Sequence, residues 1–288
     1  MEGDCRRSQC QDELSMLKLS ANVSLLYQEF PFLERVEAAA RSGFHAIEVM
    51  YPYEFSAHEL SRMLRLENMT LTVLNAPPGN YANGERGLAA LPGREQEFRD
   101  SLNLAIEYAK ITRCASIHVL TGNLPAGADK RLVMRTLREN LFYCADLFAR
   151  NGLTLLLEPL SRKMLPFYSM TRVEDASYWM GELKKGGYTN VGIQMDLYHT
   201  QMEQGNLASL IQQYIDEITY VQIAGVPGRH EPTVGEINYR YLLELLQSLD
   251  FRGWIGCEYI PRHATDDGLS WARDWGLLNS EDSPHYDT

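Results

Sequence analysis

The sequence lacks a long hydrophobic run, and no apolar stretch approaches the roughly 20 residues that are needed to cross a bilayer. The first 17 residues, MEGDCRRSQCQDELSML, include two arginines but no apolar core of the kind that a secretory signal needs. We therefore expect neither a membrane partner nor a secreted protein.

Paired cysteines are also lacking. The five cysteines are an odd number and form no CxxC motif, a pattern that is typical of free thiols in a reducing compartment. Cys114, Cys144 and Cys257 lie in apolar segments, so we expect them to be inert core residues. The cysteines therefore favour a cytoplasmic location.

Positive charge is scarce. The chain has 27 lysines and arginines against 38 aspartates and glutamates, which gives a net charge of −11. Nucleic acid is not an expected partner, because phosphate binding needs a basic surface. A small anionic substrate remains compatible with this composition, since it responds to the charge around its own site.

Strand-like and helix-like segments alternate eight times along the chain, without a clear linker between them. The strand-like segments are 18–26, 45–51, 71–76, 116–120, 153–158, 191–196, 218–222 and 254–258. Such alternation implies parallel strands joined by right-handed crossovers. Eight units fit a closed (β/α)8 TIM barrel, which usually has about 250 residues. A doubly wound sheet is disfavoured, because the segment after the first strand, LLYQEFPF, has no glycine-rich turn.

Helical periodicity and capping residues support this α/β organisation. Residues 32–42 (FLERVEAAARS) space their apolar side chains as a helix does, and Gly43 follows as a C-terminal cap. Thr171 and Glu174 have the spacing of a capping box at the start of 171–185. Further helices are predicted at 95–110, 130–150, 206–214 and 238–249.

The chain is expected to contain one catalytic domain. We predict that residues 17–278 form the TIM barrel, that residues 1–16 are a disordered N-terminal extension, and that residues 279–288 are a solvated C-terminal tail. There is no internal repeat beyond the strand–helix unit. The oligomeric state is left open between a monomer and a homodimer, because the aromatic loop 51–55 could pack against a second copy.

Four strand-like segments in the second half of the chain end on a polar residue that can bind a metal. They are LTLLLE, VGIQMD, ITYVQ and WIGCE, which end at Glu158, Asp196, Gln222 and Glu258. A buried carboxylate is costly unless it is compensated, and the C-terminal strand ends of a barrel meet at one mouth. An oxygen-only set suits Mg²⁺ or Mn²⁺ better than Zn²⁺. The sequence therefore predicts a divalent metal site; taken singly, each residue could equally bond to a loop.

These segments and their surroundings resemble the hydroxypyruvate isomerase family, which belongs to the xylose-isomerase-like group of TIM barrels. The resemblance runs from LSANVSLLY, which begins at residue 19, through NAPPGN (75–80) and LPGR (91–94) to GLSWARDW (268–275). It covers nearly the whole chain except the two ends. Its most specific parts are GRHEP (228–232), with the GE and NY pairs that follow it, and GWIGCEY (253–259).

The resemblance implies an aldose–ketose type of isomerase in carbohydrate metabolism, which converts hydroxypyruvate to 2-hydroxy-3-oxopropanoate (tartronate semialdehyde). A metal chelated by the C2 carbonyl and C3 hydroxyl oxygens would acidify the C3 hydrogen and stabilise an enediolate. Glu158 and Glu258 are then the acid–base pair, one removing the C3 proton and the other protonating C2, in an order that stays open. Asp196 and Gln222 would be ligands only.

The segment GVPGRHEP after the seventh strand is predicted to bind the substrate. Its glycines let the chain approach the mouth closely, and the guanidinium of Arg229 suits the carboxylate of a small hydroxy-keto acid. His230 is its neighbour in the same loop. The alternative for Arg229 is a surface salt bridge, for example with Glu231.

Three further residues are expected at the mouth. His199 lies three residues after Asp196 and would donate to the substrate or orient a metal ligand. His118 in SIHVL and Glu48 in AIEVM are strand residues that should point into the barrel. Each could contact the substrate or hold a neighbouring side chain instead.

Several other functions remain open, because a fold alone does not determine the substrate. A metal-dependent ketose 3-epimerase or sugar isomerase of the same barrel group would use the same glutamates on a longer polyol. A relative of apurinic endonucleases would need a histidine-rich zinc cluster and a basic groove, against which Gln222 and the net charge argue. A barrel retained as a binding or scaffold protein would need neither the metal nor the glutamates.

Overall fold

The eight strands of the computed structural model, which describes residues 14–278, close into one parallel barrel in sequence order. The strands are β1 (Lys18–Asn22), β2 (Ala46–Val49), β3 (Thr70–Asn75), β4 (Ser116–His118), β5 (Thr154–Leu157), β6 (Val191–Asp196), β7 (Ile218–Ile223) and β8 (Trp254–Cys257). The barrel is closed by β8 and β1, which pair in parallel from Lys18 opposite Trp254 onward. The predicted TIM barrel is confirmed.

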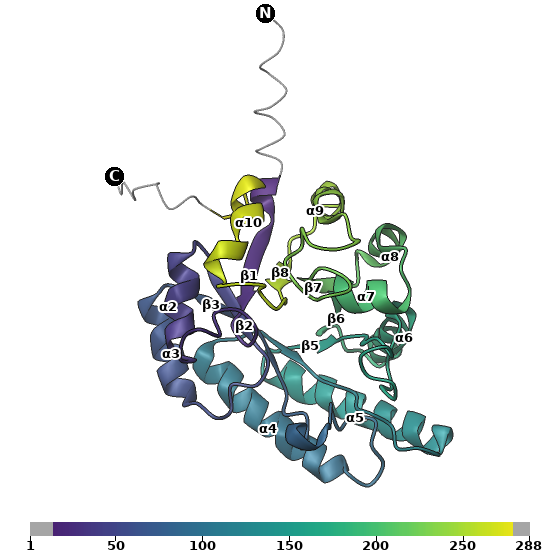
Figure 1. The fold of residues 1–288 in the computed structure, drawn as a ribbon. Coiled ribbons are helices and arrows are strands. Elements are labelled where there is room, and N and C mark those ends of the chain that lie inside the picture. Colours follow the sequence, from purple (N-terminus) through teal and green to yellow (C-terminus); the bar gives the residue numbers. More distant parts are fainter. Residues whose placement is uncertain (1–13, 279–288) are drawn as a thin grey trace, which may run out of the picture.

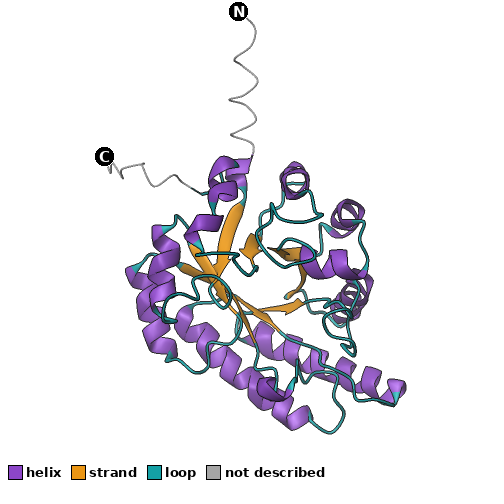
Figure 2. Ribbon diagram, viewed as in Figure 1, coloured by secondary structure: helices purple, strands orange, loops and turns teal. Residues whose placement is uncertain are grey.

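Helices surround the strands as an outer ring (Figure 1, Figure 2). They are α2 (Glu34–Arg41), α3 (Ala57–Leu66), α4 (Glu95–Thr112), α5 (Lys130–Arg150), α6 (Val173–Lys185), α7 (Leu197–Glu203), α8 (Leu207–Tyr214), α9 (Tyr239–Ser248) and α10 (Ser270–Asp274), with 3-10 turns η1 (Leu14–Met16), η2 (Tyr81–Asn83) and η3 (Asp266–Gly268). This arrangement buries the strands on both faces: all four residues of β2 and all six of β6 are buried. Such strands are expected to read as nearly continuous apolar runs. A polar residue inside one of them therefore has to find its partners within the barrel.

Capping explains where several helices begin and end. Gly43 has a φ of 93°, the left-handed conformation that glycine adopts without strain, and it follows α2 as predicted. At the start of α6 the predicted capping box is displaced. Asp175 Oδ2 accepts hydrogen bonds from the backbone N–H groups of Thr171 (3.1 Å) and Arg172 (3.0 Å). Arg172 is the cap residue, so Asp175 rather than Glu174 lies at the position that can reach back.

The predicted strands are too long at some of their C-terminal ends. Strand β1 ends at Asn22, and residues 23–29 form turns instead of continuing to residue 26. Glu158 and Glu258 lie one residue beyond β5 and β8. Helix α7, which follows β6 without a loop, has no counterpart among the predicted helices.

The predicted boundary of the barrel lies at residue 17. Leu14 in η1, which precedes that boundary, is fully buried and is part of the core. The predictions for residues 1–13 and 279–288 lie outside the described residues. Cys114, Cys144 and Cys257 are free and buried, as expected of core residues. Within 14–278, no helix combines the length and the apolar character that a membrane crossing requires.

Candidate active site

All four polar residues that were predicted from the strand ends are buried at the C-terminal end of the barrel. Their exposed fractions are 5% for Glu158, 1% for Asp196, 4% for Gln222 and 6% for Glu258. Asp196 is the last residue of β6, and Gln222 is the last but one of β7. Burial of this extent means that each side chain depends on neighbouring groups rather than on bulk water.

Gln194 connects two of these residues from the strand face that it shares with Asp196. Its Nε2 group donates to Glu158 Oε2 (2.9 Å) and to Gln222 Oε1 (2.8 Å). Gln222 Nε2 in turn donates to Glu48 Oε1 at 2.9 Å. Both ends of the Gln222 amide are therefore engaged inside the barrel.

Asn22 completes this hydrogen-bonded chain on the other side. Its Nδ2 group donates to Glu48 Oε1 (2.8 Å) and to Glu258 Oε1 (3.3 Å). The two predicted catalytic residues, Glu158 and Glu258, are thus joined through a continuous floor of buried side chains. We call this chain the amide floor; its members are Glu158, Gln194, Gln222, Glu48, Asn22 and Glu258.

Asp196 has one bonded and one unbonded oxygen. As the N-cap of α7, its Oδ1 atom accepts hydrogen bonds from the backbone N–H groups of Tyr198 (2.6 Å) and His199 (3.2 Å). Its Oδ2 atom is buried and accepts no hydrogen bond from the described residues. Arg229 Nη2 (3.5 Å) and His199 Nε2 (3.7 Å) lie near this oxygen. A buried anionic oxygen without a donor is well suited to bind a cation.

Glu158, Asp196 and His199 form a cluster whose potential ligand atoms lie within 4.8 Å of one another. The carboxylate oxygens suit a hard divalent cation, so the residues present fit such a group. His199 Nδ1, however, accepts the backbone N–H of Ser161 at 3.3 Å. In the neutral ring this places the proton on Nε2, which makes His199 a donor toward the cavity rather than a ready ligand.

The cluster differs in membership from the predicted ligand set. The carbonyl oxygen of Gln222 accepts from Gln194, and the Oε2 atom of Glu258 accepts from Arg229 at 2.7 Å. The assignment of these two as metal ligands stays a prediction. The positive charge that faces Glu258 in this structure is the guanidinium of Arg229.

Arg229 enters the site from the loop after β7, where its backbone is in the left-handed region (φ 55°). Its guanidinium lies 5.1 Å from the centre of the Tyr198 ring and is paired with Glu258. Although burial opposes the charged form, the carboxylates of Glu258 and Asp196 raise the pKa of Arg229. The alternative surface salt bridge with Glu231 does not form: Glu231 Oε1 accepts the backbone N–H of Arg262 instead.

Of the other three residues that were predicted to contact the substrate, only His118 lines the cavity. His118 lines the cavity, and its Nδ1 atom lies 3.2 Å from both Asn75 Oδ1 and Glu158 Oε2. Glu48 is buried beneath the cavity in the amide floor and does not line it. His230 lies outside the lining, with Nδ1 2.9 Å from the carbonyl oxygen of Ile260. Substrate contact is therefore supported by position for His118 but not for Glu48 or His230.

Burial dominates the electrostatics of the site. It raises the pKa of Glu258 to about 8, against the attraction of Arg229, and it raises the pKa of Glu48 to about 7. The pKa of Glu158 is also well above its usual value, because burial and the charge of Glu258 both disfavour its ionised form. Burial lowers the pKa of His118 to about 3 and that of His199 to about 4. Both imidazoles are therefore neutral near pH 7, and the carboxyl groups of Glu258 and Glu48 can hold a proton there.

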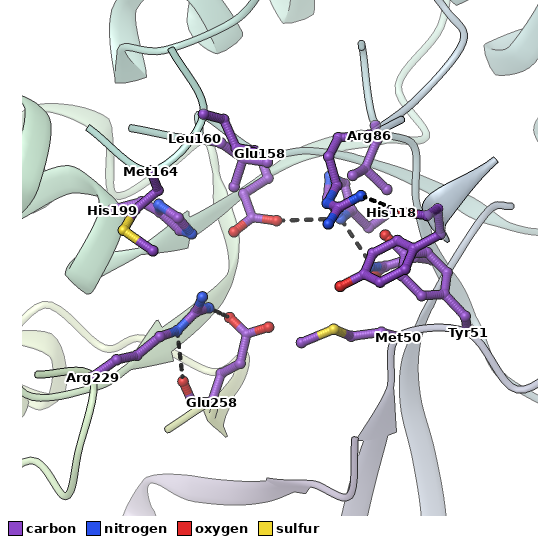
Figure 3. A pocket seen from close by; sticks show the side chains of 14 residues that line it. Met50, Tyr51, Arg86, His118, Glu158, Leu160, Met164, His199, Arg229 and Glu258 are labelled. Carbon is purple, nitrogen blue, oxygen red and sulfur yellow. Dashed lines mark hydrogen bonds and ion pairs between the residues drawn. The ribbon is translucent and has the colours of Figure 1, made fainter. Parts of the chain in front are cut away.

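Glu158, Glu258, His118, His199 and Arg229 line a cavity of about 300 Å³ (Figure 3). It is lined by Met50, Tyr51, Asn75, Tyr81, Arg86, His118, Leu120, Glu158, Leu160, Met164, Leu165, His199, Arg229 and Glu258. Below it lies a second cavity of about 20 Å³ above the amide floor, bounded among others by Glu48, Gln194 and Gln222. Figure 3 shows Glu158 and Glu258 facing each other across the larger cavity.

Gln194 and Arg86 are polar residues of this site that sequence reasoning missed. Gln194 lies two positions before Asp196 on β6, and because strand side chains alternate between faces it had to share the face of Asp196. That signal could have found it. Arg86 lies in an irregular loop after β3, where no periodicity points to the cavity.

The chain is similar to a known barrel family and to curated proteins. A family model described as xylose isomerase-like TIM barrel matches residues 36–275. The 2-oxo-tetronate isomerase of Cupriavidus necator is 44% identical over 260 residues, which cover 90% of this chain and 99% of that protein. The hydroxypyruvate isomerase of Escherichia coli is 41% identical over 256 residues, which cover 89% of this chain and 98% of that protein.

Two solved structures have a similar fold, one at high and one at low sequence identity. A protein from Brucella melitensis, described as an AP endonuclease of family 2, is 42% identical with a TM-score of 0.85, covering 90% of this chain and 98% of its own. D-psicose 3-epimerase from Clostridium cellulolyticum is 16% identical with a TM-score of 0.72, covering 88% and 89%. At that identity the likeness supports the fold alone.

Proposed function

The chain belongs to the xylose isomerase-like TIM barrel family, and we propose that it isomerises a small 2-oxo acid, hydroxypyruvate, to 2-hydroxy-3-oxopropanoate. Its similarity to hydroxypyruvate isomerase and 2-oxo-tetronate isomerase supports a sugar-acid isomerase. One observation carries the proposal: two buried glutamates, Glu158 and Glu258, face each other across one cavity (Figure 3). The isomerisation needs one group to remove a proton from C3 and another to deliver one to C2.

The proton chemistry follows from the two carboxyl groups. One glutamate, ionised, takes the C3 hydrogen as the electron pair of the C–H bond moves toward C2 and the C2 oxygen becomes negative. The other glutamate, protonated, then adds its proton to C2 while the hydroxyl proton on the C3 oxygen passes to the C2 oxygen, so that C3 becomes the aldehyde and C2 carries the hydroxyl. With a pKa of about 8, Glu258 makes a protonated acid available near neutral pH, and burial raises the pKa of Glu158 in the same direction. The order in which they act is left open.

Neighbouring side chains prepare this transfer. The amide floor holds both carboxylates in place, through Gln194 on one side and Asn22 on the other. His199, with its proton on Nε2, is placed to donate a hydrogen bond to a substrate oxygen. Leu160 and Leu165 line the cavity and help to exclude water from the proton that is being moved.

We infer that a divalent cation, Mg²⁺ or Mn²⁺, completes the site. Asp196 Oδ2 and the Glu158 carboxylate would hold it, and Gln222 and Glu258 stay predicted ligands. When bound, it would supply positive charge that stabilises the oxygen on which negative charge develops. The proposed partner is thus a small anionic hydroxy-keto acid.

Hydrogen exchange at C3 tests the proposal directly. Wild-type protein and hydroxypyruvate are mixed in D₂O, with added Mg²⁺ or Mn²⁺ or with a chelator, and deuterium at C3 is followed by proton NMR. We expect exchange together with aldehyde formation, and a loss of 10²-fold or more in Glu158→Gln and Glu258→Gln, the usual size of acid–base catalysis. Glu37→Gln, which alters an exposed pair on α2, is the matched control. No exchange under any metal condition would rule the proposal out.

The same preparation separates the other candidate functions. A ketose 3-epimerase would convert fructose to psicose faster than it converts hydroxypyruvate. An endonuclease would cleave DNA that contains an apurinic site; the similarity to the Brucella protein makes this assay necessary, although the candidate metal cluster has a single histidine. A binding protein would be indifferent to Glu158→Gln and Glu258→Gln.

A further inference from the structure

We propose that Arg86 binds the carboxylate of the substrate and thereby makes the cavity selective for 2-oxo acids. This assignment rests on the proposed function, because it concerns the same cavity. It differs from the sequence prediction, in which Arg229 held the carboxylate. Two cations lie in the wall of this cavity: Arg229 is paired with a carboxylate, whereas Arg86 forms no ion pair with a carboxylate of the described residues.

Arg86 is held on a well-defined loop between β3 and α4. The next residue, Gly87, has a φ of 113°, and a Cβ atom there would lie 2.2 Å from the carbonyl oxygen of Leu120. The backbone of the loop is therefore pressed against the segment that follows β4, where Gly87 forms an isolated bridge with Thr121. This close approach fixes where the side chain of Arg86 starts.

Side-chain contacts fix the guanidinium as well. It stacks on the ring of Tyr81, 3.7 Å from the ring centre, and Nη1 donates to the carbonyl oxygens of Tyr81 (3.1 Å) and Glu85 (2.7 Å). Glu85 is not its ion-pair partner, because the carboxylate of Glu85 pairs with Arg94. No ion pair of Arg86 with a carboxylate is found within residues 14–278. The charge is thus positioned in advance and not neutralised, which lowers the entropy cost of binding an anion.

Arg229, the other arginine of the cavity, is committed elsewhere. Its Nη2 atom lies 2.7 Å from Glu258 Oε2 and 3.5 Å from Asp196 Oδ2. A substrate carboxylate at Arg229 would have to displace Glu258 or lie beside two carboxylates, and like charges at such distances repel. Arg229 is better suited to position Glu258 than to receive an anion.

The placement of the two arginines orients the substrate. Figure 3 shows Arg86 and Arg229 on opposite sides of the cavity, with Glu158 and Glu258 between them. With its carboxylate at Arg86, a 2-oxo acid extends C2 and C3 toward the two glutamates. The anionic end then lies on the side away from Arg229 and its paired carboxylates. Hydroxypyruvate and 2-oxo-tetronate share this end, so one anchor serves both.

Binding measured without turnover tests the assignment. Hydroxypyruvate is titrated by calorimetry into Glu158→Gln and into the double variant Glu158→Gln/Arg86→Gln. Loss of charge-assisted hydrogen bonds should weaken binding about 10- to 100-fold. Arg86→Lys, which keeps the charge, should regain a large part of the loss. Arg162→Gln is the control, since Arg162 pairs with Glu203 at the end of α7 and lies outside the cavity lining.

Kinetics distinguish an anchor from a residue that only supports the loop. In the otherwise wild-type chain, Arg86→Gln should raise KM for hydroxypyruvate by a similar factor and leave kcat within about threefold, with an unchanged thermal unfolding midpoint. Binding within threefold of the parent, an equal loss in Arg162→Gln, or a fall in kcat at constant KM would each overturn the assignment. If Glu158→Gln binds hydroxypyruvate and Arg86→Gln weakens that binding, while the wild type does not isomerise the compound, the proposed function fails and the assignment of Arg86 stands.

Discussion

Glu258 offers the most direct test of the electrostatics of the site. Its carboxyl group is buried, and its pKa is raised from the ordinary value of 4.5 to about 8. Burial is the largest cause, Arg229 opposes it, and the charges of Asp196 and Glu48 add to it. Replacing it by glutamine, Glu258→Gln, removes the ionisable group with little change in shape.

The magnitude follows from the linkage between proton binding and stability. A carboxyl group with a raised folded-state pKa binds more protons in the folded than in the unfolded chain. Its contribution to stability is therefore complete below pH 4.5 and is lost as the pH rises through about 8. One pKa unit corresponds to about 1.4 kcal/mol, so the loss for this group amounts to at most roughly 5 kcal/mol. Glu258→Gln lacks this loss.

Urea unfolding at pH 5, 7 and 9, followed by tryptophan fluorescence, measures the effect. A chelator is present throughout, so that metal binding does not contribute to stability. We expect the free energy of unfolding of Glu258→Gln, relative to the wild type, to increase steadily from pH 5 to pH 9. At pH 5 the variant should be no more stable than the wild type, because the introduced NH2 group faces either Asn22 Nδ2 or Arg229 Nη2, which are both donors.

The control is Glu37→Gln, in an exposed pair with Arg41, whose effect should stay within about 0.5 kcal/mol at every pH. A difference between Glu258→Gln and the wild type that does not change with pH, or that falls as the pH rises, would refute the reasoning. It would mean that Glu258 ionises at an ordinary pH despite its burial.

Three further predictions follow from the same geometry. Replacing Gln194 by leucine removes the donor that orients Glu158, so kcat/KM should fall about tenfold or more in steady-state assays; a change below twofold would contradict this. Gly256→Ala would place a Cβ atom 2.4 Å from Glu48 Oε2 and should cost about 1–3 kcal/mol in urea unfolding, whereas Gly181→Ala in α6, with open space around its Cβ, should be neutral or stabilising by up to about 1 kcal/mol. The pH profile of kcat/KM should be bell-shaped with both limbs above the ordinary carboxyl range, because the pKa values of both cavity glutamates are raised; a rising limb near pH 4.5 would argue against it.

The barrel could be predicted because its signal is local. Alternation of apolar strands with amphipathic helices is visible over short windows, and the rule that parallel strands close through right-handed crossovers converts it into a fold. The residues at which helices and strands begin and end were harder to predict. At the start of α6 the side chain that reaches back to the cap belongs to Asp175 and not to Glu174, because the cap residue is Arg172 and not Thr171.

The position of the site could also be predicted, but not its internal bonding. Polar residues at strand ends had to meet at one mouth once the barrel closed, which placed Glu158, Asp196 and Glu258. The tautomer of His199 depends on a backbone N–H at Ser161, 38 residues away in sequence. The hydrogen bond from Gln194 to Gln222 depends on the register between β6 and β7.

The sequence by itself determined the eight-stranded barrel, the end of it at which the candidate site lies, and the kinds of side chain gathered there, since all of these follow from periodicity along the chain. Only the tertiary structure decided that Asn22 bonds to Glu258 across 236 positions, that Glu48 lies beneath the cavity, and that Arg86 stands in its wall. The physical reason is that hydrogen bonds, burial and pKa values depend on distances in space. Neighbouring residues in the sequence do not set those distances until the chain has closed.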